Sequence, residues 1–158
     1  MSTARASFLS APRCISQTIF ASELTASVNG AAQTITLSEG LPAQAIVLQR
    51  WITVNTEFSG GGVATMVADV GWSGGGADPN GWYAAENIFT GSGTGIRNVP
   101  GTTGARLDGG AADVETAARA ITVAFDPDAG HALEDLTAGS LSVNVIYVIQ
   151  AANDLILP

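Results

Sequence analysis

The stretch from Gln44 to Phe58 constrains the fold more than any other part of this chain. Apolar side chains recur in it at every second position with polar side chains between them, which is the pattern of a strand that buries one face. Arg50 falls on the apolar face, so we expect a bend, a bulge or a sheet edge there, or two strands joined at Gln49 to Trp51. The predicted inner face consists of Ile46, Leu48, Ile52, Val54 and Phe58.

The composition extends this strand prediction to the whole chain. With 158 residues, 46% of them hydrophobic, the chain is long enough for one domain with a single core. Its 19 glycines and six prolines indicate many tight turns between short elements. An all-β architecture is therefore predicted.

Other alternating or apolar runs predict the remaining strands. One run follows the glycines after Phe58, so Gln44 to Phe58 and Val63 to Trp72 are predicted to form a hairpin. The run from Ser16 to Ser27 fits either a short strand or a helical turn. The other predicted strands are Gln33 to Leu37, Arg119 to Phe125, and Ser140 to Ile149, which is apolar on both faces and should lie centrally in its sheet.

Two segments are predicted as long loops. Residues 71–95 are rich in glycine and hold two of the three tryptophans, with room for one short strand at Tyr83 to Phe89. Residues 91–118 continue in the same way, apart from a brief helix at Asp113 to Ala118. Loops of this length in a compact domain are usually functional, disordered or interfacial.

The charge excludes two classes of partner. The net charge is −8, and all six cationic residues are arginines. Nucleic acids and anionic membranes would be repelled by such a surface. No apolar run reaches the roughly 18 residues of a membrane span. The first residues lack a convincing signal peptide because Ser7, Ser10 and Pro12 interrupt them, so we expect synthesis and folding in the cytoplasm.

Candidates for catalytic chemistry are few. Cys14 is the single cysteine, so it forms no intrachain disulfide and is interpreted as incidental. His131 is the single histidine and lies in an acidic turn without a second histidine or cysteine as a partner, so it is interpreted as a surface turn residue. Convergent acid, base and nucleophile are not recognisable, and no catalytic residue, cofactor or metal is predicted.

Two short acidic turns leave calcium open as an alternative. Asp78 to Gly81 and Asp126 to Gly130 offer oxygen ligands at alternate positions, which is how calcium loops are built. In the first turn, however, Trp82 occupies the third ligand position. The same residues are also those of ordinary turns.

Three aromatic residues are the strongest candidates for binding. Trp72, Trp82 and Tyr83 are suited to stacking on sugar rings, to packing beneath the long loop, or to the centre of a protein interface. Packing or an interface is the favoured interpretation.

A series of segments resembles a known class of proteins. The segments are TITL, LPAQAIVLQRWITVNTEFSGG, VATMVADVGW with the following DPNGWYAAENIF, ITVAF, and LTAGSLSVNVIYV. Together they cover roughly Gln33 to Ile149 and resemble the small β-sandwich virion proteins of tailed bacteriophages. Such proteins are similar to capsid decoration or cement proteins with a jelly-roll-like body.

This resemblance implies a fold and a role. The expected organisation is a flexible N-terminal arm at 1–16, a jelly-roll-like β-sandwich at 17–150 and a C-terminal tail at 151–158. The expected role is structural, on the outside of a tailed-phage capsid, with the major capsid protein and further copies of the chain, as a homotrimer, as partners. The alternative is a receptor- or glycan-binding module of a tail or fibre. The residues expected to contact partners are Arg5, Arg13, Trp72, Trp82, Tyr83, Leu155, Ile156 and Leu157.

Overall fold

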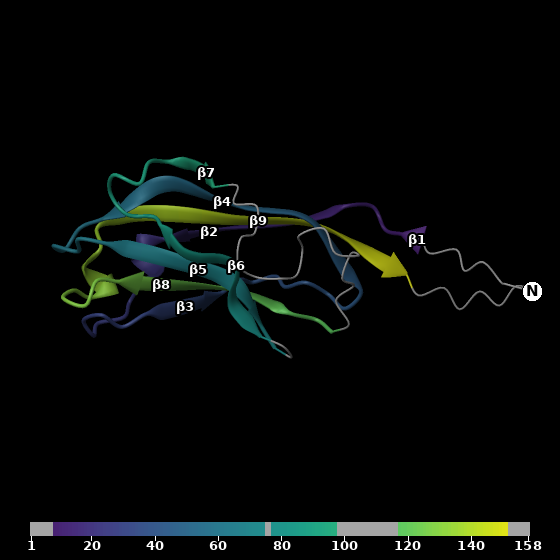
Figure 1. Ribbon diagram of the computed structural model, residues 1–158, viewed down its shortest axis with the longest axis horizontal. Helices are drawn as coiled ribbons and strands as arrows, with labels where there is room; N and C mark the ends of the chain where they lie inside the picture. Colours follow the sequence, from purple (N-terminus) through teal and green to yellow (C-terminus); the bar gives the residue numbers. More distant parts are fainter. Residues whose placement is uncertain (1–7, 75–76, 98–116, 152–158) are drawn as a thin grey trace, which may run out of the picture.

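The computed structural model describes residues 8–74, 77–97 and 117–151, which form two β-sheets packed face to face (Figure 1). Helical structure in this part of the chain is limited to two 3-10 turns, η1 (Ala21–Glu23) and η2 (Leu133–Asp135). The predicted all-β sandwich is confirmed. No helix in these ranges is long and apolar enough to span a membrane.

The first sheet has five strands and is antiparallel throughout. Its central strand is β9, as predicted; β4 pairs with one edge of β9, while β1 and β2 pair with successive parts of the other edge. β7 lies beyond β4. The strands are β1 (Phe8–Leu9), β2 (Arg13–Phe20), β4 (Ala45–Ser59), β7 (Gly95–Arg97) and β9 (Ala138–Ala151).

The second sheet has four antiparallel strands in the order β3-β8-β5-β6. Apart from the short β1, the two sheets thus contain eight strands in the orders β2-β9-β4-β7 and β3-β8-β5-β6, which is the jelly-roll arrangement. The strands are β3 (Gln33–Thr36), β5 (Met66–Ser73), β6 (Asp78–Asn87) and β8 (Ala120–Pro127).

The predicted hairpin of β4 with β5 was wrong. β4 pairs with β9 and β7, whereas β5 pairs with β8 and β6 in the opposite sheet. The connecting glycines 60–62 all have positive φ, which allows the chain to turn from one sheet to the other. A period-two pattern shows that a segment is a strand but does not specify its partner, and consecutive jelly-roll strands often lie in opposite sheets.

The strand β4 contains the bulge expected near Arg50. The register with β9 shifts between Val47 and Gln49, and Leu48 at this point is 55% exposed. Ile52, Val54 and Phe58 are fully buried, as predicted. Before the bulge the alternation is reversed, so Ala45 and Val47 pack inward and the inner positions predicted for Ile46 and Leu48 were wrong.

The two ends of the described chain lie side by side. β1 pairs with the last residues of β9, Phe8 with Ala151 and Leu9 with Gln150, at one end of the sandwich (Figure 1). The boundary of the predicted N-terminal arm was wrong, because residues 13–16 belong to β2 and pair with β9. The predicted C-terminal tail beyond Ala151 and most of the predicted helix at 113–118 lie outside the described residues.

Candidate functional site

All three aromatic residues belong to strands, which agrees with the strand ends predicted at Trp72 and Tyr83 but not with the loop expected around Trp82. Trp72 lies in β5, and Trp82 and Tyr83 lie in β6; their side chains are 5%, 6% and 4% exposed. The loop prediction failed because the glycines here permit close packing. A Cβ at Gly81 would overlap the ring of Trp72, and a Cβ at Gly71 would overlap the backbone of β6.

Two arginines stack on the tryptophans. The guanidinium carbon of Arg119 lies 5.7 Å from the centre of the Trp72 ring, and that of Arg50 lies 5.8 Å from the centre of the Trp82 ring. The two rings are 5.9 Å apart and tilted by 52°. Since Arg119 is only 7% exposed, the electron-rich ring face stabilises a charge that is largely removed from water.

This Arg–Trp cluster bears on the glycan-binding alternative. Stacking on a sugar requires an aromatic face that is open to solvent. Trp72 and Trp82 belong to the core, where their rings contact each other and each lies beneath a guanidinium group. The burial of both rings therefore disfavours sugar stacking at this position.

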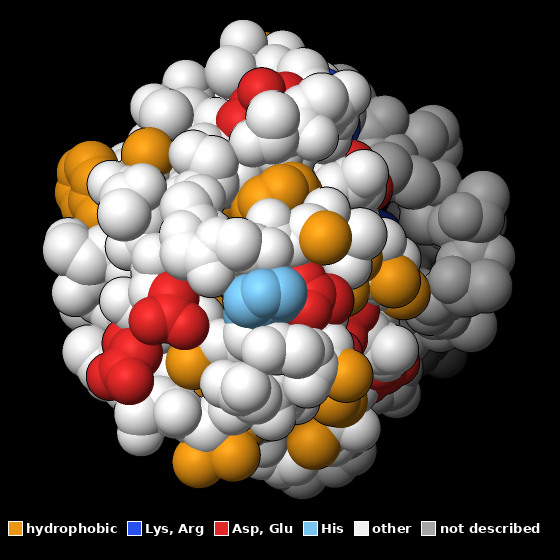
Figure 2. Space-filling view, turned by 90° about the vertical axis from the view of Figure 1, so that its left-hand side faces the viewer, with side chains coloured by type: hydrophobic (Ala, Val, Ile, Leu, Met, Phe, Trp, Pro, Cys, Tyr) orange, Lys and Arg blue, Asp and Glu red, His pale blue; other side chains and the backbone are white. Residues whose placement is uncertain are grey.

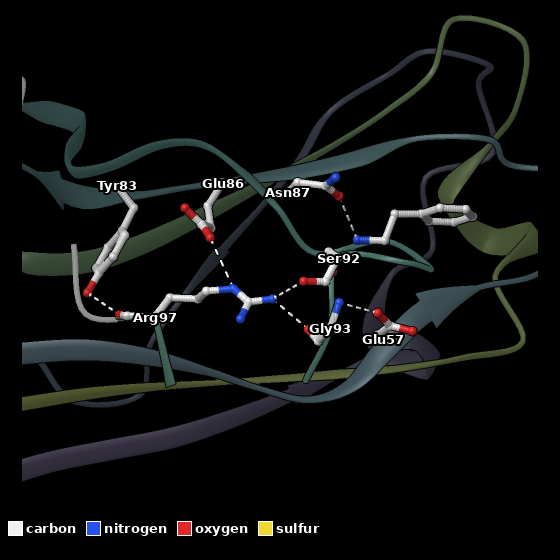
Figure 3. Close-up of polar contacts among 8 residues, drawn as sticks. Glu57, Tyr83, Glu86, Asn87, Ser92, Gly93 and Arg97 are labelled. Atoms are coloured by element: carbon white, nitrogen blue, oxygen red, sulfur yellow. Dashed lines mark hydrogen bonds and ion pairs between the residues drawn. The ribbon is translucent and has the colours of Figure 1, made fainter. Parts of the chain in front are cut away.

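A second cluster, which the sequence did not indicate, surrounds Arg97 in β7 (Figure 3). Its guanidinium group donates to the carbonyl oxygen of Ser92 at 2.7 Å and to that of Gly93, and its Nε lies 3.2 Å from the Glu86 carboxylate. The Tyr83 hydroxyl donates to the carbonyl oxygen of Arg97 at 2.9 Å. Since Tyr83 and Glu86 belong to β6, these contacts tie the outer strands of the two sheets together.

Further hydrogen bonds hold the segment between β6 and β7 against the sandwich. The Asn87 side chain accepts a hydrogen bond from the N–H of Phe89 at 3.0 Å, and the Glu57 carboxylate in β4 accepts one from the N–H of Gly93 (Figure 3). The backbone N–H of Thr90 donates to the carbonyl oxygen of Phe58 at 3.1 Å. The connection is thus held on the sandwich by both backbone and side-chain contacts.

The acidic turn after β8 is arranged around Asp128. Its carboxylate accepts hydrogen bonds from the N–H of Ala64 at 2.7 Å, of Gly130 at 3.0 Å and of Thr65 at 3.4 Å, and lies 2.7 Å from Nδ1 of His131. The Ala64 N–H is the largest cause, followed by His131, of a pKa for this carboxyl well below its ordinary value of 3.8. Figure 2 shows the histidine in pale blue beside acidic side chains, at the end of the sandwich away from β1.

These contacts bear on the calcium alternative. The Asp128 carboxylate faces N–H donors, which occupy the oxygens that a cation would require. The other acidic turn is part of β6. Within residues 8–74, 77–97 and 117–151, no group of three or more His, Cys, Asp or Glu side chains is placed to hold a metal ion.

Of the remaining residues expected to bind partners, Arg13 alone belongs to the described part of the chain. Arg13 is exposed at the start of β2, opposite Tyr147 of β9. Arg5 and the three residues 155–157 lie outside the described residues. The described strands next to these segments, β1 and the end of β9, are paired with each other, Phe8 with Ala151.

The fold and these contacts define a two-sheet, jelly-roll β-sandwich with buried aromatic residues and fastened loops. No family model matches the chain, and no curated protein matches it. Among solved structures, it is similar to a chain of the cyanophage Pam1 capsid asymmetric unit, with 19% sequence identity and a TM-score of 0.57. The match covers 94% of this chain and 92% of that one, so the fold is shared over nearly the full length of both.

Proposed function

We propose that the chain is a structural virion protein that binds the outside of a tailed-phage capsid and stabilises it, as a decoration or cement protein does. The observation that carries this proposal is the shared fold with a chain of a cyanophage capsid asymmetric unit. Coverage above 90% of both chains supports a shared architecture across the given chain, which a small common motif would not.

The placement of the chain ends supports a specific mode of attachment. Phe8 and Ala151 are paired neighbours, so the residues before β1 and after β9 start from the same place. The N-terminal segment contains Arg5 and the C-terminal one the apolar residues 155–157. Two such segments starting side by side are suited to reaching the same site on the capsid surface, with the sandwich standing above it.

The internal contacts fit a structural role. The Arg97 cluster, the Asp128 turn and the Arg–Trp cluster each fix a connection or an edge of the sandwich. A protein that stabilises a shell gains from rigidity, because a rigid body loses less conformational entropy on binding.

Deletion of each arm tests this mode of attachment. Residues 1–7 and 152–158 are removed separately and together, which leaves every paired strand intact. We expect the double deletion to fold, as judged by circular dichroism, but to lose co-sedimentation with capsids that lack the protein. Val28→Asp, in a turn at the opposite end of the sandwich, is the control and should bind like the unaltered chain.

Two results would count against the proposal. Full capsid binding by the double deletion would exclude the arms as the contacts. Labelled protein found at the tail of intact particles by electron microscopy would instead favour the alternative of a tail or fibre module.

A further inference from the structure

Polar side chains on the outer face of the five-stranded sheet form hydrogen bonds with one another. Its side chains are linked across strands: Ser16 donates to Asn144 at 2.8 Å, Thr18 and Ser142 share a hydrogen bond of 2.7 Å, and Asn55 donates to Ser142 at 2.7 Å. These contacts join β2, β9 and β4 on one side of the sheet. They hold small polar groups in a fixed pattern on a flat surface.

The middle of this outer face carries no charge among the described residues. In the block formed by residues 14–20, 49–55, 96 and 140–146, the outward-facing residues include no acidic and no basic side chain. The outer face of the four-stranded sheet differs, because Asp69 of β5 and Asp126 of β8 point outward there. Among the described residues of a chain with a net charge of −8, this block is therefore free of outward-facing acids.

The same face gathers exposed apolar side chains. Phe20, which follows the buried Ile19 in β2, is 52% exposed, and Ile96, which pairs with Thr53 of β4, is 63% exposed. Leu48, at the bulge of β4, is 55% exposed. Thus three of the four large hydrophobic residues that are exposed in the described chain belong to this sheet, and the fourth, Val28, lies in a distant turn. An uncharged surface with exposed apolar groups is typical of a protein interface.

We propose that a second copy of this chain packs against the outer face of the five-stranded sheet. Two copies with a net charge of −8 repel each other, and an approach that brings acidic surfaces together is costly. The uncharged face avoids this cost. Its hydroxyl and amide groups can also pair with the same groups on a second copy, because each of them both donates and accepts hydrogen bonds. A basic partner would instead find its complement on the acidic faces.

The size of the face predicts the strength of this contact. Three strands spaced by about 4.8 Å, with about eight residues each, give a flat area of roughly 400 Å² per copy. Standard interfaces bury about 800 Å² per partner, so association in solution should be weak and dependent on concentration. If the proposed function holds, attachment to a capsid raises the local concentration of neighbouring copies and strengthens the contact.

Sedimentation equilibrium of the isolated protein, without capsids, tests this inference. The mean mass of the unaltered chain should rise with concentration, and added salt should strengthen the association because it screens the residual repulsion. Ile96→Asp should weaken self-association about tenfold or more, which corresponds to about 1.4 kcal/mol. Val28→Asp is the matched control: it places the same charge at an apolar residue of similar exposure, 67%, and should leave the association unchanged.

A chain that stays monomeric up to its solubility limit would overturn the inference. So would self-association that Ile96→Asp leaves unchanged, or self-association that Val28→Asp weakens as much as Ile96→Asp does. Circular dichroism of each variant excludes misfolding as the cause. The result is separable from the proposed function, because a monomer that binds capsids would contradict only the contact between copies. Conversely, an oligomer that ignores capsids would contradict only the capsid-binding role.

Discussion

The guanidinium carbon of Arg50 lies 5.8 Å from the centre of the Trp82 ring, and this contact joins the two sheets of the sandwich. Arg50 belongs to β4 in the first sheet and Trp82 to β6 in the second. The arginine that interrupts the apolar face of β4 is thus accommodated by an aromatic ring from the opposite sheet. Arg50 is only partly buried, and the face of the Trp82 ring stabilises its charge on the inner side of β4.

Replacing Trp82 should destabilise the fold. Trp82→Ala removes a ring that is 6% exposed and leaves a cavity, so we expect a loss of about 3–5 kcal/mol in the free energy of unfolding. Trp82→Phe keeps an aromatic face beneath Arg50 and should cost roughly half as much. Urea denaturation measures both; equal losses for the two variants would show that a phenyl ring restores neither the packing nor the contact with Arg50.

The Arg97 cluster should contribute measurably to stability. Arg97→Ala removes the contacts with Glu86 and with two backbone carbonyls, and we expect a loss of about 2 kcal/mol. Arg97→Lys keeps the charge but not the planar fork, so about half of the loss should remain. The exposed Arg13 provides the control, since Arg13→Ala should change stability by less than about 0.5 kcal/mol. In Arg97→Ala, faster backbone hydrogen exchange in β7 with unchanged exchange in β8 would show that the loss of stability is local to the Arg97 cluster.

Stability should depend on pH through Asp128. The pKa of its carboxyl is lowered by folding, so the folded state favours the ionised form. The resulting stabilisation is fully present above the ordinary value of 3.8 and is lost as the pH falls below it toward the folded value. In urea denaturation between about pH 6 and pH 2, Asp128→Asn should therefore lose less stability on acidification than the unaltered chain. Asp126→Asn, at an exposed position, should keep the original dependence; identical curves for all three proteins would refute the assignment.

Gly139 should tolerate no side chain. Its φ is +141°, and a Cβ at this position would overlap the fully buried ring of Phe58. Gly139→Ala should cost about 3 kcal/mol or more, through backbone strain and overpacking together. At Gly91, φ is +87° but no atom lies within 4 Å of the added Cβ, so Gly91→Ala isolates the backbone cost of about 1–2 kcal/mol. If Gly139→Ala and Gly91→Ala lose similar amounts of unfolding free energy, the Phe58 ring must move aside for the added Cβ at little cost.

The sequence predicted the strands better than their partners. Alternation in β4 and β8 and the apolar run of β9 predicted these strands almost at their observed bounds. The pairing of β4 with β9 was not predictable in this way, because it joins residues about a hundred positions apart and leaves no local signal. The bulge at Leu48 was indicated by Arg50, but its effect on Ala45 and Val47 depended on the register with β9.

The site was less predictable than the fold. The glycines around Trp72 and Trp82 indicated a loop, whereas in the structure they allow a ring and a neighbouring strand to approach closely. Nothing in the sequence brings Arg97 to Tyr83 and Glu86, because the contact depends on the outer strands of two different sheets meeting. Likewise, the uncharged outer face becomes visible only when β2, β9 and β4 are aligned in register.

The pairing of Phe8 with Ala151 has a practical consequence for protein engineering. A guest peptide joined directly before Phe8 or directly after Ala151 would start at the same end of the sandwich, where it would compete with any attachment made there. The turns at 28–31 and 128–131 lie at the opposite end (Figure 1). Asp128 ties down the second turn, and in the first turn Asn29 and Gly30 donate to the carbonyl oxygens of Gly130 and His131. An epitope or an affinity tag is therefore best inserted before Asn29, next to the exposed Val28.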